Sequence, residues 1–473
     1  MQSGSTPYGT NGGEGNRRTT RRRKAEGGPR IPRGSRGNVF FKGRRIVKVA
    51  FVSLGCPKNR VDTESLLSFL LTQGFSLSSE EEADAIVINT CAFIKPAVRE
   101  ALREIRRVRR KGKPLAVVGC LPQRWRNNLS RIDAAVILGL GKGWRLPEAL
   151  RKASEGIKTI DVDEPDPLNT PPRIVLTTFP YAYLKIADGC DNRCNYCTIP
   201  YIRGGFKSRR MEDILAEAEE LVKKGIKEII LVAQETTRYG LDIYGELTLP
   251  QLLAKLSNTD VKWIRVMYMH PSRITPPLLE TMAETNKIVK YFDIPFQHAS
   301  PRILKLMGRE GSAERYLRLI EEIRRAIPSA CFRSSFIVGF PTESEEDFQM
   351  LLEFLRETKL DKVGFFPYYS ERGTKSSHLP PLQGEIVKER LKSAMELQKK
   401  IARERNRLWI GREMEVLVEG INGRRFSGRS FREAPEVDGW VLLKAKDCRV
   451  GSFVSAKILN ADSYNLYAEE VER

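Results

Sequence analysis

Three cysteines within eight residues have the spacing in this sequence that most directly indicates chemistry. They are Cys190, Cys194 and Cys197, in the pattern C-x3-C-x2-C. A structural zinc site normally has four Cys or His ligands, and the nearest histidine, His270, is far downstream. Three thiolates on a four-iron cluster would leave one iron open to a small molecule, and the spacing differs from that of ferredoxins. The pattern favours such a cluster over the alternative, a degenerate zinc loop.

Three further cysteines each follow a short apolar run in the first third of the chain. The runs and their cysteines are 46–52 with Cys56, 85–89 with Cys91, and 115–118 with Cys120. Such runs are typical of strands buried on both faces, and the stretches between them have helical periodicity. The order β-α-β-α-β predicts parallel strands with right-handed crossovers. Because open α/β sheets bind ligands at their carboxyl edge, we expect the three thiols to hold a second cluster there, again with an open iron.

An alternative for these three residues is that they are unrelated buried cysteines, since free Cys often behaves as a small apolar residue. Three equivalent strand-end positions, 35 and 29 residues apart, argue against coincidence. Cys331 and Cys448 have no partners at a useful spacing, and we expect them not to be ligands. Eight cysteines without a secretory signal indicate a reducing compartment and metal chemistry rather than disulfides.

The length and charge of the chain limit the remaining possibilities. Its 473 residues predict two or three domains with real cores, and no apolar run approaches a membrane span. The net charge of +21 suggests an anionic partner such as a ribonucleoprotein, but residues 1–45 hold 12 Lys and Arg against 2 Asp and Glu. We expect this basic tail to be disordered, because it cannot bury enough apolar surface. A nucleic-acid-binding arm, an organelle transit peptide and an extension without a role all fit its composition.

Two domains and a linker account for residues 46–408. An open parallel α/β domain is expected at 46–155, followed by a linker at 156–180 that is rich in Pro, Asp and Thr. Between 181 and 408, apolar runs alternate with helical stretches, which predicts a partial (β/α)6 barrel with its chemistry at the carboxyl ends of the strands. The six runs are 182–187, 228–233, 262–267, 289–294, 331–338 and 362–367. The loop with Cys190 follows the first of them.

Residues 409–473 have the alternation of short half-buried strands. The predicted strands are 414–420, 426–430, 440–443 and 453–459. A small antiparallel β-barrel is the natural closure for strands of this length. Residues 411–473 hold 10 Lys and Arg against 11 Asp and Glu, so this domain is near neutral. That charge favours docking onto a basic protein over binding an RNA backbone.

The residues around Cys190 resemble the signature of radical S-adenosylmethionine enzymes. A short buried strand at 183–187 precedes the cysteine loop, and an aromatic residue, Tyr196, precedes the last cysteine. The resemblance implies that the open iron binds the amino and carboxylate groups of S-adenosylmethionine, with Tyr196 near the adenine. It also implies that the strand end from Ile337 to Gly339 lies near the adenine, and that Gln234, after the second barrel strand, contacts this cofactor.

A three-cysteine domain followed by this loop resembles the methylthiotransferase family, whose members insert a sulfur atom and a methyl group into an unactivated C–H bond. Four segments are similar to the branch that modifies a ribosomal protein (RimO-type), namely Val52–Asn59, Gly119–Arg124, Gln234–Gly240 and Pro295–His298. The C-terminal domain resembles the TRAM domain, through Gly428–Arg429 and Ala434–Gly439. Arg60, Thr63 and Glu235 depart from the branch, which often has Leu, Ser and Asp there. The resemblance covers roughly residues 46–473.

The resemblance implies a radical reaction on a protein. One electron passes to S-adenosylmethionine at Cys190, Cys194 and Cys197, and the 5′-deoxyadenosyl radical removes a hydrogen from the β-carbon of an aspartate in small-subunit ribosomal protein twelve. A radical is needed because no side-chain base could remove that hydrogen. The sulfur is carried at Cys56, Cys91 and Cys120 and is methylated by a second S-adenosylmethionine. Both open irons must then face one cavity between the first two domains.

The implied protein is a cytoplasmic monomer that takes electrons from a donor such as flavodoxin or ferredoxin, without contact to a membrane; the sulfur donor is left open. Two other interpretations are weighed against it. The first is a tRNA adenosine methylthiotransferase of the same family, against which the matches at Pro57–Asn59, Gln234–Thr237 and Pro295–His298 and the near-neutral last domain argue. The second is a non-catalytic iron–sulfur or zinc protein that binds RNA through its basic tail. Iron content and cleavage of S-adenosylmethionine would decide the second.

Overall fold

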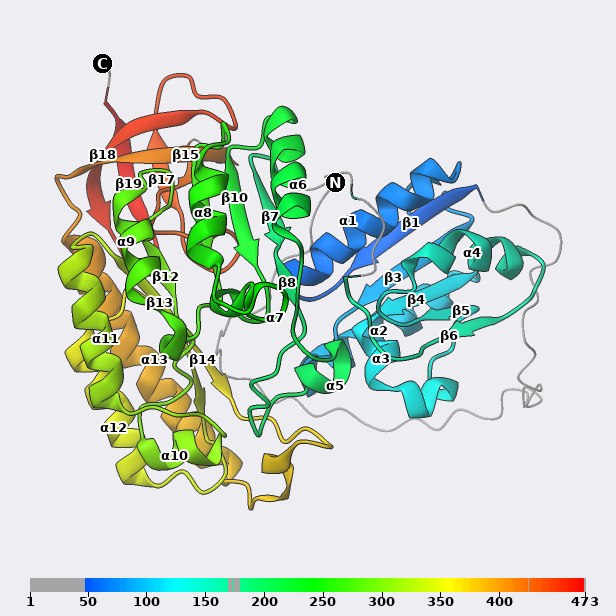
Figure 1. Cartoon of the computed structure of the whole chain (residues 1–473), viewed down its shortest axis with the longest axis horizontal. Coiled ribbons are helices and arrows are strands. Elements are labelled where there is room, and N and C mark those ends of the chain that lie inside the picture. The colour runs from blue at the N-terminus through cyan, green and yellow to red at the C-terminus, as the bar shows by residue number, and fades with distance from the viewer. Residues whose placement is uncertain (1–46, 169–172, 174–178, 424, 472–473) are drawn as a thin grey trace, which may run out of the picture. The chain divides into compact units, whose positions relative to one another are not determined.

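The computed structural model describes residues 47–168, 173, 179–423 and 425–471. The predictions for the basic tail at 1–45 concern residues outside this range. The described chain forms an α/β sheet domain, a partial barrel and a small closed β-barrel, in this order along the sequence (Figure 1).

The N-terminal domain contains a six-stranded parallel sheet in the order β2-β1-β3-β4-β5-β6. Its strands are β1 (Lys48–Ser53), β2 (Ser76–Leu77), β3 (Ala85–Thr90), β4 (Leu115–Gly119), β5 (Val136–Leu138) and β6 (Thr159–Asp161). The three strands predicted from apolar runs, β1, β3 and β4, are confirmed and are neighbours in the sheet. Strand β6 lies within 156–180, which was expected to be a linker, because its residues pair with β5 and extend the sheet.

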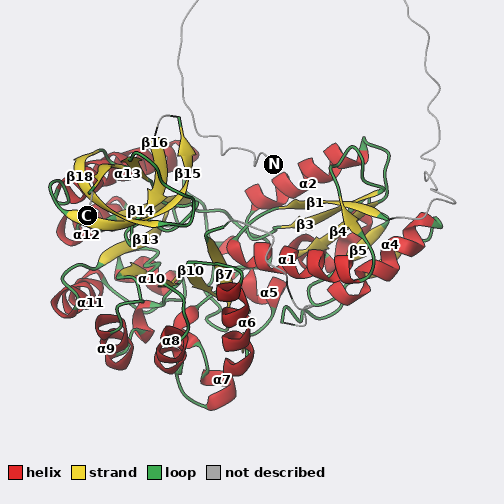
Figure 2. Cartoon of the chain, turned by 90° about the horizontal axis from the view of Figure 1, so that it is seen from above, coloured by secondary structure: helices red, strands yellow, loops and turns green. Residues whose placement is uncertain are grey.

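Helices cover both faces of this sheet (Figure 2). On one face, α2 (Lys95–Arg109) packs Ala101 and Ile105 against strand residues such as Ile86. On the other face, α1 (Pro57–Thr72) and α4 (Leu146–Ser154) pack against Val87 and its neighbours. Because successive side chains of a strand point to opposite faces, strands covered on both sides must be apolar throughout. The shorter elements are α3 (Cys120–Arg124), η1 (Arg126–Arg131) and η2 (Gly143–Arg145).

The central domain is a partial barrel of six parallel strands, as predicted. They are β7 (Tyr181–Lys185), β10 (Glu228–Val232), β11 (Trp263–Val266), β12 (Tyr291–Asp293), β13 (Cys331–Val338) and β14 (Lys362–Pro367). They form two three-stranded sheets, β7-β10-β11 and β12-β13-β14, and a parallel bridge from Ile264 to Ile288 joins the two. Beyond β7, a two-stranded pair, β8 (Ala187–Asp188) and β9 (Lys207–Ser208), flanks the loop that carries Cys190.

Helices line the outside of the partial barrel (Figure 2). Its largest apolar cluster includes Leu184 and Leu231 from the strands and Leu221 and Ile320 from the helices. Helix α12 begins with a capping box between Ser344 and Asp347. Among the described residues, no helix has the length and apolar character needed to cross a membrane. The helices of this domain are α5 (Ile199–Arg203), α6 (Met211–Lys223), α7 (Leu241–Tyr244), α8 (Leu249–Ser257), α9 (Pro276–Glu284), α10 (Pro301–Leu306), α11 (Ala313–Ala326), α12 (Glu345–Thr358) and α13 (Gly384–Arg407), with 3-10 turns η3 (Thr236–Arg238), η4 (Pro271–Arg273) and η5 (Lys375–His378).

The C-terminal domain is a closed five-stranded barrel in the order β15-β16-β17-β19-β18. Its strands are β15 (Glu413–Asn422), β16 (Arg425–Arg429), β17 (Val441–Lys444), β18 (Phe453–Ala461) and β19 (Leu466–Glu470). The predicted small barrel is confirmed, with one parallel pair, β17 and β19, in an otherwise antiparallel arrangement. Strand β19 was not predicted.

The segment Arg429–Asp438 of this barrel packs against the amino ends of the central strands. Arg429 Nη2 lies 2.5 Å from Oε2 of Glu228, the first residue of β10. The hydroxyl of Tyr291, the first residue of β12, donates a hydrogen bond to Asp438 at 2.6 Å. The C-terminal barrel therefore covers the amino end of the partial barrel, opposite the carboxyl end that the cysteine loop follows.

Candidate functional site

Cys56, Cys91 and Cys120 lie at one edge of the N-terminal sheet. Cys56 directly precedes α1, Cys91 follows β3, and Cys120 is the first residue of α3. The strands that lead to them, β1, β3 and β4, are adjacent and parallel. Because the carboxyl ends of parallel strands share an edge, the structure brings these thiols together as their spacing predicted.

The packing around these thiols is close. Gly55 has a left-handed φ of +97°, and a Cβ at this position would lie 2.5 Å from Cβ of Cys91, so only glycine fits there. Burial, followed by the effect of Cys120 and Cys56, raises the pKa of Cys91 to about 12. Burial also raises the pKa of Cys120 to about 11, against the opposing effect of Arg203. The three thiols therefore lie close together at this edge of the sheet.

Two asparagines connect the loops that carry these cysteines. The amide nitrogen of Asn59 donates hydrogen bonds to Leu54 O at 3.0 Å and Thr90 O at 2.9 Å. The amide nitrogen of Asn89 donates to Asn59 O and to Thr63 Oγ1, both at 2.9 Å. Because these groups are buried, the bonds hold the loops after β1 and β3 in a fixed relation.

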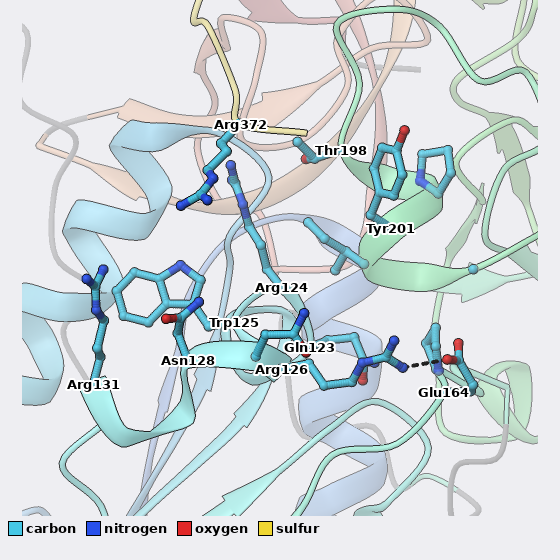
Figure 3. A pocket seen from close by; sticks show the side chains of 15 residues that line it. Gln123, Arg124, Trp125, Arg126, Asn128, Arg131, Glu164, Thr198, Tyr201 and Arg372 are labelled. Carbon is cyan, nitrogen blue, oxygen red and sulfur yellow. Dashed lines mark hydrogen bonds and ion pairs between the residues drawn. The ribbon is translucent and has the colours of Figure 1, made fainter. Parts of the chain in front are cut away.

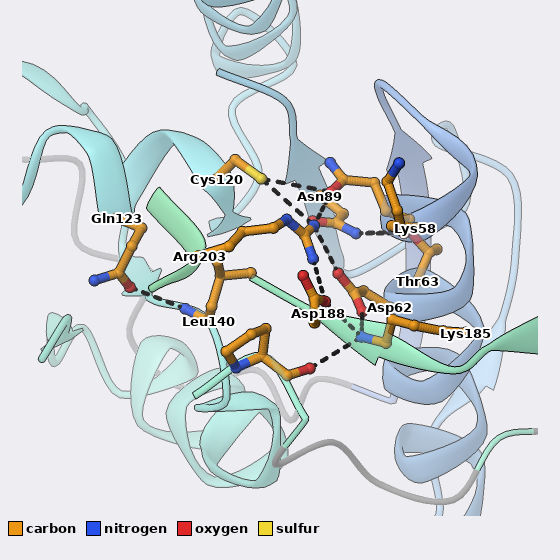
Figure 4. Close-up of polar contacts among 12 residues, drawn as sticks. Lys58, Asp62, Thr63, Asn89, Cys120, Gln123, Leu140, Lys185, Asp188 and Arg203 are labelled. Carbon is orange, nitrogen blue, oxygen red and sulfur yellow. Dashed lines mark hydrogen bonds and ion pairs between the residues drawn. The ribbon is translucent and has the colours of Figure 1, made fainter. Parts of the chain in front are cut away.

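A cluster of four charged side chains is buried beside Cys120 (Figure 4). Lys185 Nζ lies 2.6 Å from Asp62 and 3.0 Å from Asp188. The guanidinium of Arg203 lies 3.0 Å from Asp62 and 2.6 Å from Asp188. Two cations and two carboxylates thus neutralise one another, which allows charge to be buried. The cluster joins α1 of the N-terminal domain to β7, β8 and α5 of the central domain.

Arg203 connects this charge cluster to a thiol. Its Nη2 lies 3.6 Å from Sγ of Cys120. Burial alone would lower the pKa of Arg203, but Asp188, Cys120 and Asp62 hold it well above its ordinary value. The side chain is therefore a permanent cation beside Cys120.

Contacts to residues 306–309 hold the second cysteine loop. Asn195 donates from its backbone N–H to Met307 O and from its amide nitrogen to Leu306 O, both at 2.8 Å. Arg309 Nη1 lies 3.8 Å from Sγ of Cys194, which places a second cation beside a cysteine. Burial raises the pKa of Cys190 to about 11.

The two cysteine-bearing regions touch each other. Thr198, the residue after Cys197, donates a hydrogen bond from Oγ1 to the carbonyl of Phe93, two residues after Cys91, at 2.7 Å. The contact of Arg203 with Cys120 is the second link. The two groups of thiols therefore lie on adjoining segments of two domains.

A single metal ion and an iron–sulfur cluster need different arrangements of thiols. Within the described residues, no three His, Cys, Asp or Glu side chains are close enough to share a single ion. The ligands of one zinc ion all lie about 2.0–2.3 Å from the metal, whereas three thiolates on a four-iron cluster bind three different irons. Three thiols that hold a cluster therefore need not converge on a single ion.

The four residues expected to contact S-adenosylmethionine differ in what surrounds them. Gln234 follows β10, and both polar atoms of its amide are buried without a hydrogen-bond partner in the described chain, which is costly unless a ligand supplies one. Tyr196 is half-buried against the barrel core. Ile337 is half-buried, and its N–H donates to a backbone carbonyl at 2.8 Å. Gly339 has φ of +75°, and a Cβ there would lie 2.5 Å from Val387, so packing alone explains this glycine.

The residues that depart from the RimO-type pattern all have partners. Thr63 and Glu235 are buried, and Arg60 lies at the contact with the C-terminal domain. The contacts are an ion pair of Arg60 with Glu436, a 2.9 Å hydrogen bond to Thr63 from Asn89, and a 2.7 Å ion pair of Glu235 with Arg273. Each of these three side chains is therefore accommodated by a polar partner in the fold.

Sequence reasoning missed the charge cluster beside Cys120. One signal was present, because Lys185 and Asp188 flank an apolar strand end, where a charge must be paired. Their partners could not be found from spacing, since Asp62 is 123 residues from Lys185 and 141 residues from Arg203.

Three family models match the chain in the order of its domains. The uncharacterized protein family UPF0004 matches 48–141, the radical SAM superfamily matches 184–355, and the TRAM domain matches 410–471. Among solved structures, the radical S-adenosylmethionine methyltransferase TsrM from Kitasatospora setae, with cobalamin and a [4Fe-4S] cluster bound, has a TM-score of 0.53 at 14% identity. The match covers 70% of this chain and 77% of that one, which shows a shared fold. The fold and the models thus define a radical S-adenosylmethionine protein with an added α/β domain and a TRAM domain.

The sequence relatives narrow the class. The ribosomal protein uS12 methylthiotransferase RimO of Moorella thermoacetica is 45% identical over 430 residues, which are 89% of this chain and 98% of the relative. The protein of the same name from Pelotomaculum thermopropionicum is 45% identical over 446 residues, 90% of this chain and 99% of the relative. The chain belongs to this family of uS12 methylthiotransferases (RimO). The branch inferred from the sequence motifs is confirmed.

Proposed function

We propose that this protein adds a methylthio group to the β-carbon of an aspartate in ribosomal protein uS12, the small-subunit ribosomal protein twelve. The observation that carries the proposal is the contact between the two cysteine-bearing regions, through Thr198 with Phe93 and Arg203 with Cys120. Such a contact suits a reaction in which one site makes a carbon radical and the other delivers sulfur to it. The relatives that carry the name uS12 methylthiotransferase support the substrate.

Six cysteines would hold two four-iron clusters in this proposal. Cys190, Cys194 and Cys197 would hold one, and Cys56, Cys91 and Cys120 the other. With S-adenosylmethionine bound, these cofactors supply the radical, the sulfur and the methyl group. Each group of three thiols would leave one iron of a four-iron cluster without a protein ligand, so that each site could accept a further molecule.

The surrounding residues position these groups. Arg203 and the two asparagines behind Cys120 fix the thiols of the N-terminal site, and Arg309 places a cation beside Cys194. The amide of Gln234, which has no hydrogen-bond partner in the described chain, would form a hydrogen bond with a polar group of S-adenosylmethionine. Tyr196 would lie near the adenine, with the strand end from Ile337 to Gly339 beside it.

The proposal also covers the electron donor, the oligomeric state and the cellular compartment of the enzyme. A reduced electron carrier such as flavodoxin or ferredoxin would supply electrons. The protein would act as a monomer in the cytoplasm, where ribosomal subunits are assembled.

The mass of uS12 after anaerobic turnover tests the proposal. The protein, reconstituted with iron and sulfide, is incubated with a reductant, S-adenosylmethionine, uS12 and total tRNA in one reaction. We expect uS12 to gain the mass of a methylthio group in place of one hydrogen, at an aspartate, while the tRNA nucleosides stay unchanged. A methylthio group on a tRNA adenosine, with unmodified uS12, would contradict the proposal.

A further inference from the structure

A cavity of about 730 Å³ lies where the N-terminal and central domains meet (Figure 3). Its walls come from 123–131, which follow Cys120, from 198–204, which follow Cys197, and from Glu164, Pro165 and Arg372. None of the six cysteines lines it. It is therefore a surface beside the thiol sites and distinct from them.

The walls of this cavity are cationic. Four arginines line it, Arg124, Arg126, Arg131 and Arg372, against one carboxylate, Glu164, but Arg124 is paired at 2.5 Å with the buried carboxylate of Glu371. Arg126 pairs with Glu164 at 2.5 Å, but both side chains are exposed, and such surface pairs are weak. Arg131 and Arg372 are exposed and have no ion-pair partner among the residues that the structure describes. An anionic ligand is therefore favoured.

Two aromatic rings accompany these arginines. Tyr201 is 63% exposed, and the ring of Trp125 is half-buried. In Figure 3 the side chains of Arg124 and Arg372 lie between these two rings. Arginines bind backbone phosphates, while aromatic rings stack unpaired bases. An acidic peptide or a free phosphate could use the arginines but would leave the exposed ring of Tyr201 without a stacking partner.

We propose that this cavity binds a single-stranded RNA segment. The inference rests on the proposed function and deepens it, because the RNA would be ribosomal RNA next to uS12 in the assembled subunit. The enzyme would then recognise its protein substrate together with the neighbouring RNA. The C-terminal barrel does not supply a comparable charge, since residues 411–473 hold 10 Lys and Arg against 11 Asp and Glu.

Fluorescence anisotropy of a labelled single-stranded oligoribonucleotide, at several salt concentrations, tests this inference with the full chain. For single strands the slope of log K against log salt changes by about 0.7 for each phosphate contact. The double variant Arg131→Gln/Arg372→Gln should therefore bind more weakly and lose about 1.4 of this slope. Tyr201→Ala should weaken binding by about fivefold or more and leave the slope unchanged, because a ring carries no charge.

A matched control removes the same charge elsewhere. Lys399 and Arg403 are exposed on α13 and do not line the cavity, so Lys399→Gln/Arg403→Gln should leave affinity and slope unchanged. The basic tail at 1–45 is the same in every variant and cancels from the comparison. Equal behaviour of the cavity variant and this control would overturn the inference. The inference would also be overturned if polyglutamate displaced the labelled RNA as effectively as unlabelled RNA does, because the site would then bind anions in general.

The binding measurement needs no turnover. A failure to bind RNA therefore overturns only this inference, and the mass of uS12 decides the proposed function separately.

Discussion

Nη2 of Arg203 lies 3.6 Å from Sγ of Cys120, so that a cation of the central domain touches a thiol of the N-terminal domain. The helix that carries Arg203 begins at Ile199, two residues after Cys197. One short segment thus supplies a cysteine of one site and a partner for a cysteine of the other. A displacement of the loop with Cys197 would therefore change the contact between Arg203 and Cys120.

Replacement of Arg203 should change the properties of the N-terminal cluster. Arg203→Gln removes a buried cation and leaves Asp62 and Asp188 with one partner fewer, which should destabilise the fold by about 3–5 kcal/mol. It should also make the reduction potential of this cluster more negative, because a nearby cation favours the reduced form. Arg203→Lys keeps the positive charge, so the reduction potential of its N-terminal cluster should lie between those of the Gln variant and the wild type. Redox titration followed by electron paramagnetic resonance measures this, and equal potentials in the Gln and Lys variants would refute the electrostatic role.

The two groups of cysteines should separate two activities. Cys91→Ala should abolish methylthiolation of uS12 but leave reductive cleavage of S-adenosylmethionine, because the second group of thiols is intact. Cys194→Ala should abolish both. Chromatography of 5′-deoxyadenosine and the mass of uS12 report the two activities in one reaction. Methylthiolation by Cys91→Ala would show that the assignment of two clusters is wrong.

Gly55→Ala should remove the N-terminal cluster through a steric effect. The new Cβ would meet Cβ of Cys91 at 2.5 Å, so we expect the iron content to fall by about half, from about eight irons per chain. Gly74→Ala is the matched control, because Gly74 also has a left-handed φ, of +83°, but has nothing within 4 Å of an added Cβ. Both variants share the backbone strain, so iron analysis isolates the clash. Equal iron in both would contradict the packing argument.

Gln234→Leu should weaken binding of S-adenosylmethionine without destabilising the protein. The amide of Gln234 has no hydrogen-bond partner in the described chain, so removing it also removes the cost of burying an unpaired polar group. The loss of a hydrogen bond to the ligand should lower the affinity for S-adenosylmethionine roughly tenfold. In Gln398 the amide nitrogen donates to Leu360 O at 2.9 Å. Gln398→Leu should therefore lower the melting temperature and leave the affinity unchanged. Isothermal titration and thermal melting measure the two effects, and the opposite pattern would exclude Gln234 from the cofactor site.

Glu228 should make stability depend on acid pH. Burial would raise its pKa, but Arg265 at 2.7 Å and Arg429 at 2.5 Å hold it below its ordinary value. A carboxyl whose pKa is lower in the folded state stabilises above its unfolded pKa, about 4.3 for glutamate, and loses this contribution as the pH falls through the folded value. Glu228→Gln should thus lower the urea midpoint at pH 7, and its difference from the wild type should shrink below about pH 4. A difference that is constant between pH 7 and pH 3 would count against this ion pair.

The strand-end cysteines could be predicted because two regularities act together. Apolar runs marked β1, β3 and β4, and the parallel order of these strands placed the cysteine that follows each run at one edge of the sheet. Strands β2, β5 and β6 could not be predicted from the sequence, because a strand of two or three residues shows no periodicity. Such strands form only through pairing with a neighbouring strand. Pairing across domains, as between Asp62 and Arg203, depends on packing that no local pattern encodes. Gly339 matched a motif, yet Val387 on a distant helix gives it a steric reason of its own.

The position of Arg429–Asp438 limits how this enzyme can be recombined with its relatives. The visible boundary between modules is the loop after α13, but Arg429 and Asp438 are bound to the first residues of β10 and β12. A chimaera cut at that loop would bring in a foreign segment without its matching Glu228 and Tyr291. A successful graft of the C-terminal barrel should therefore also carry the first residues of β10 and β12 from the donor protein. The segment that must be exchanged as one piece is larger than the C-terminal domain.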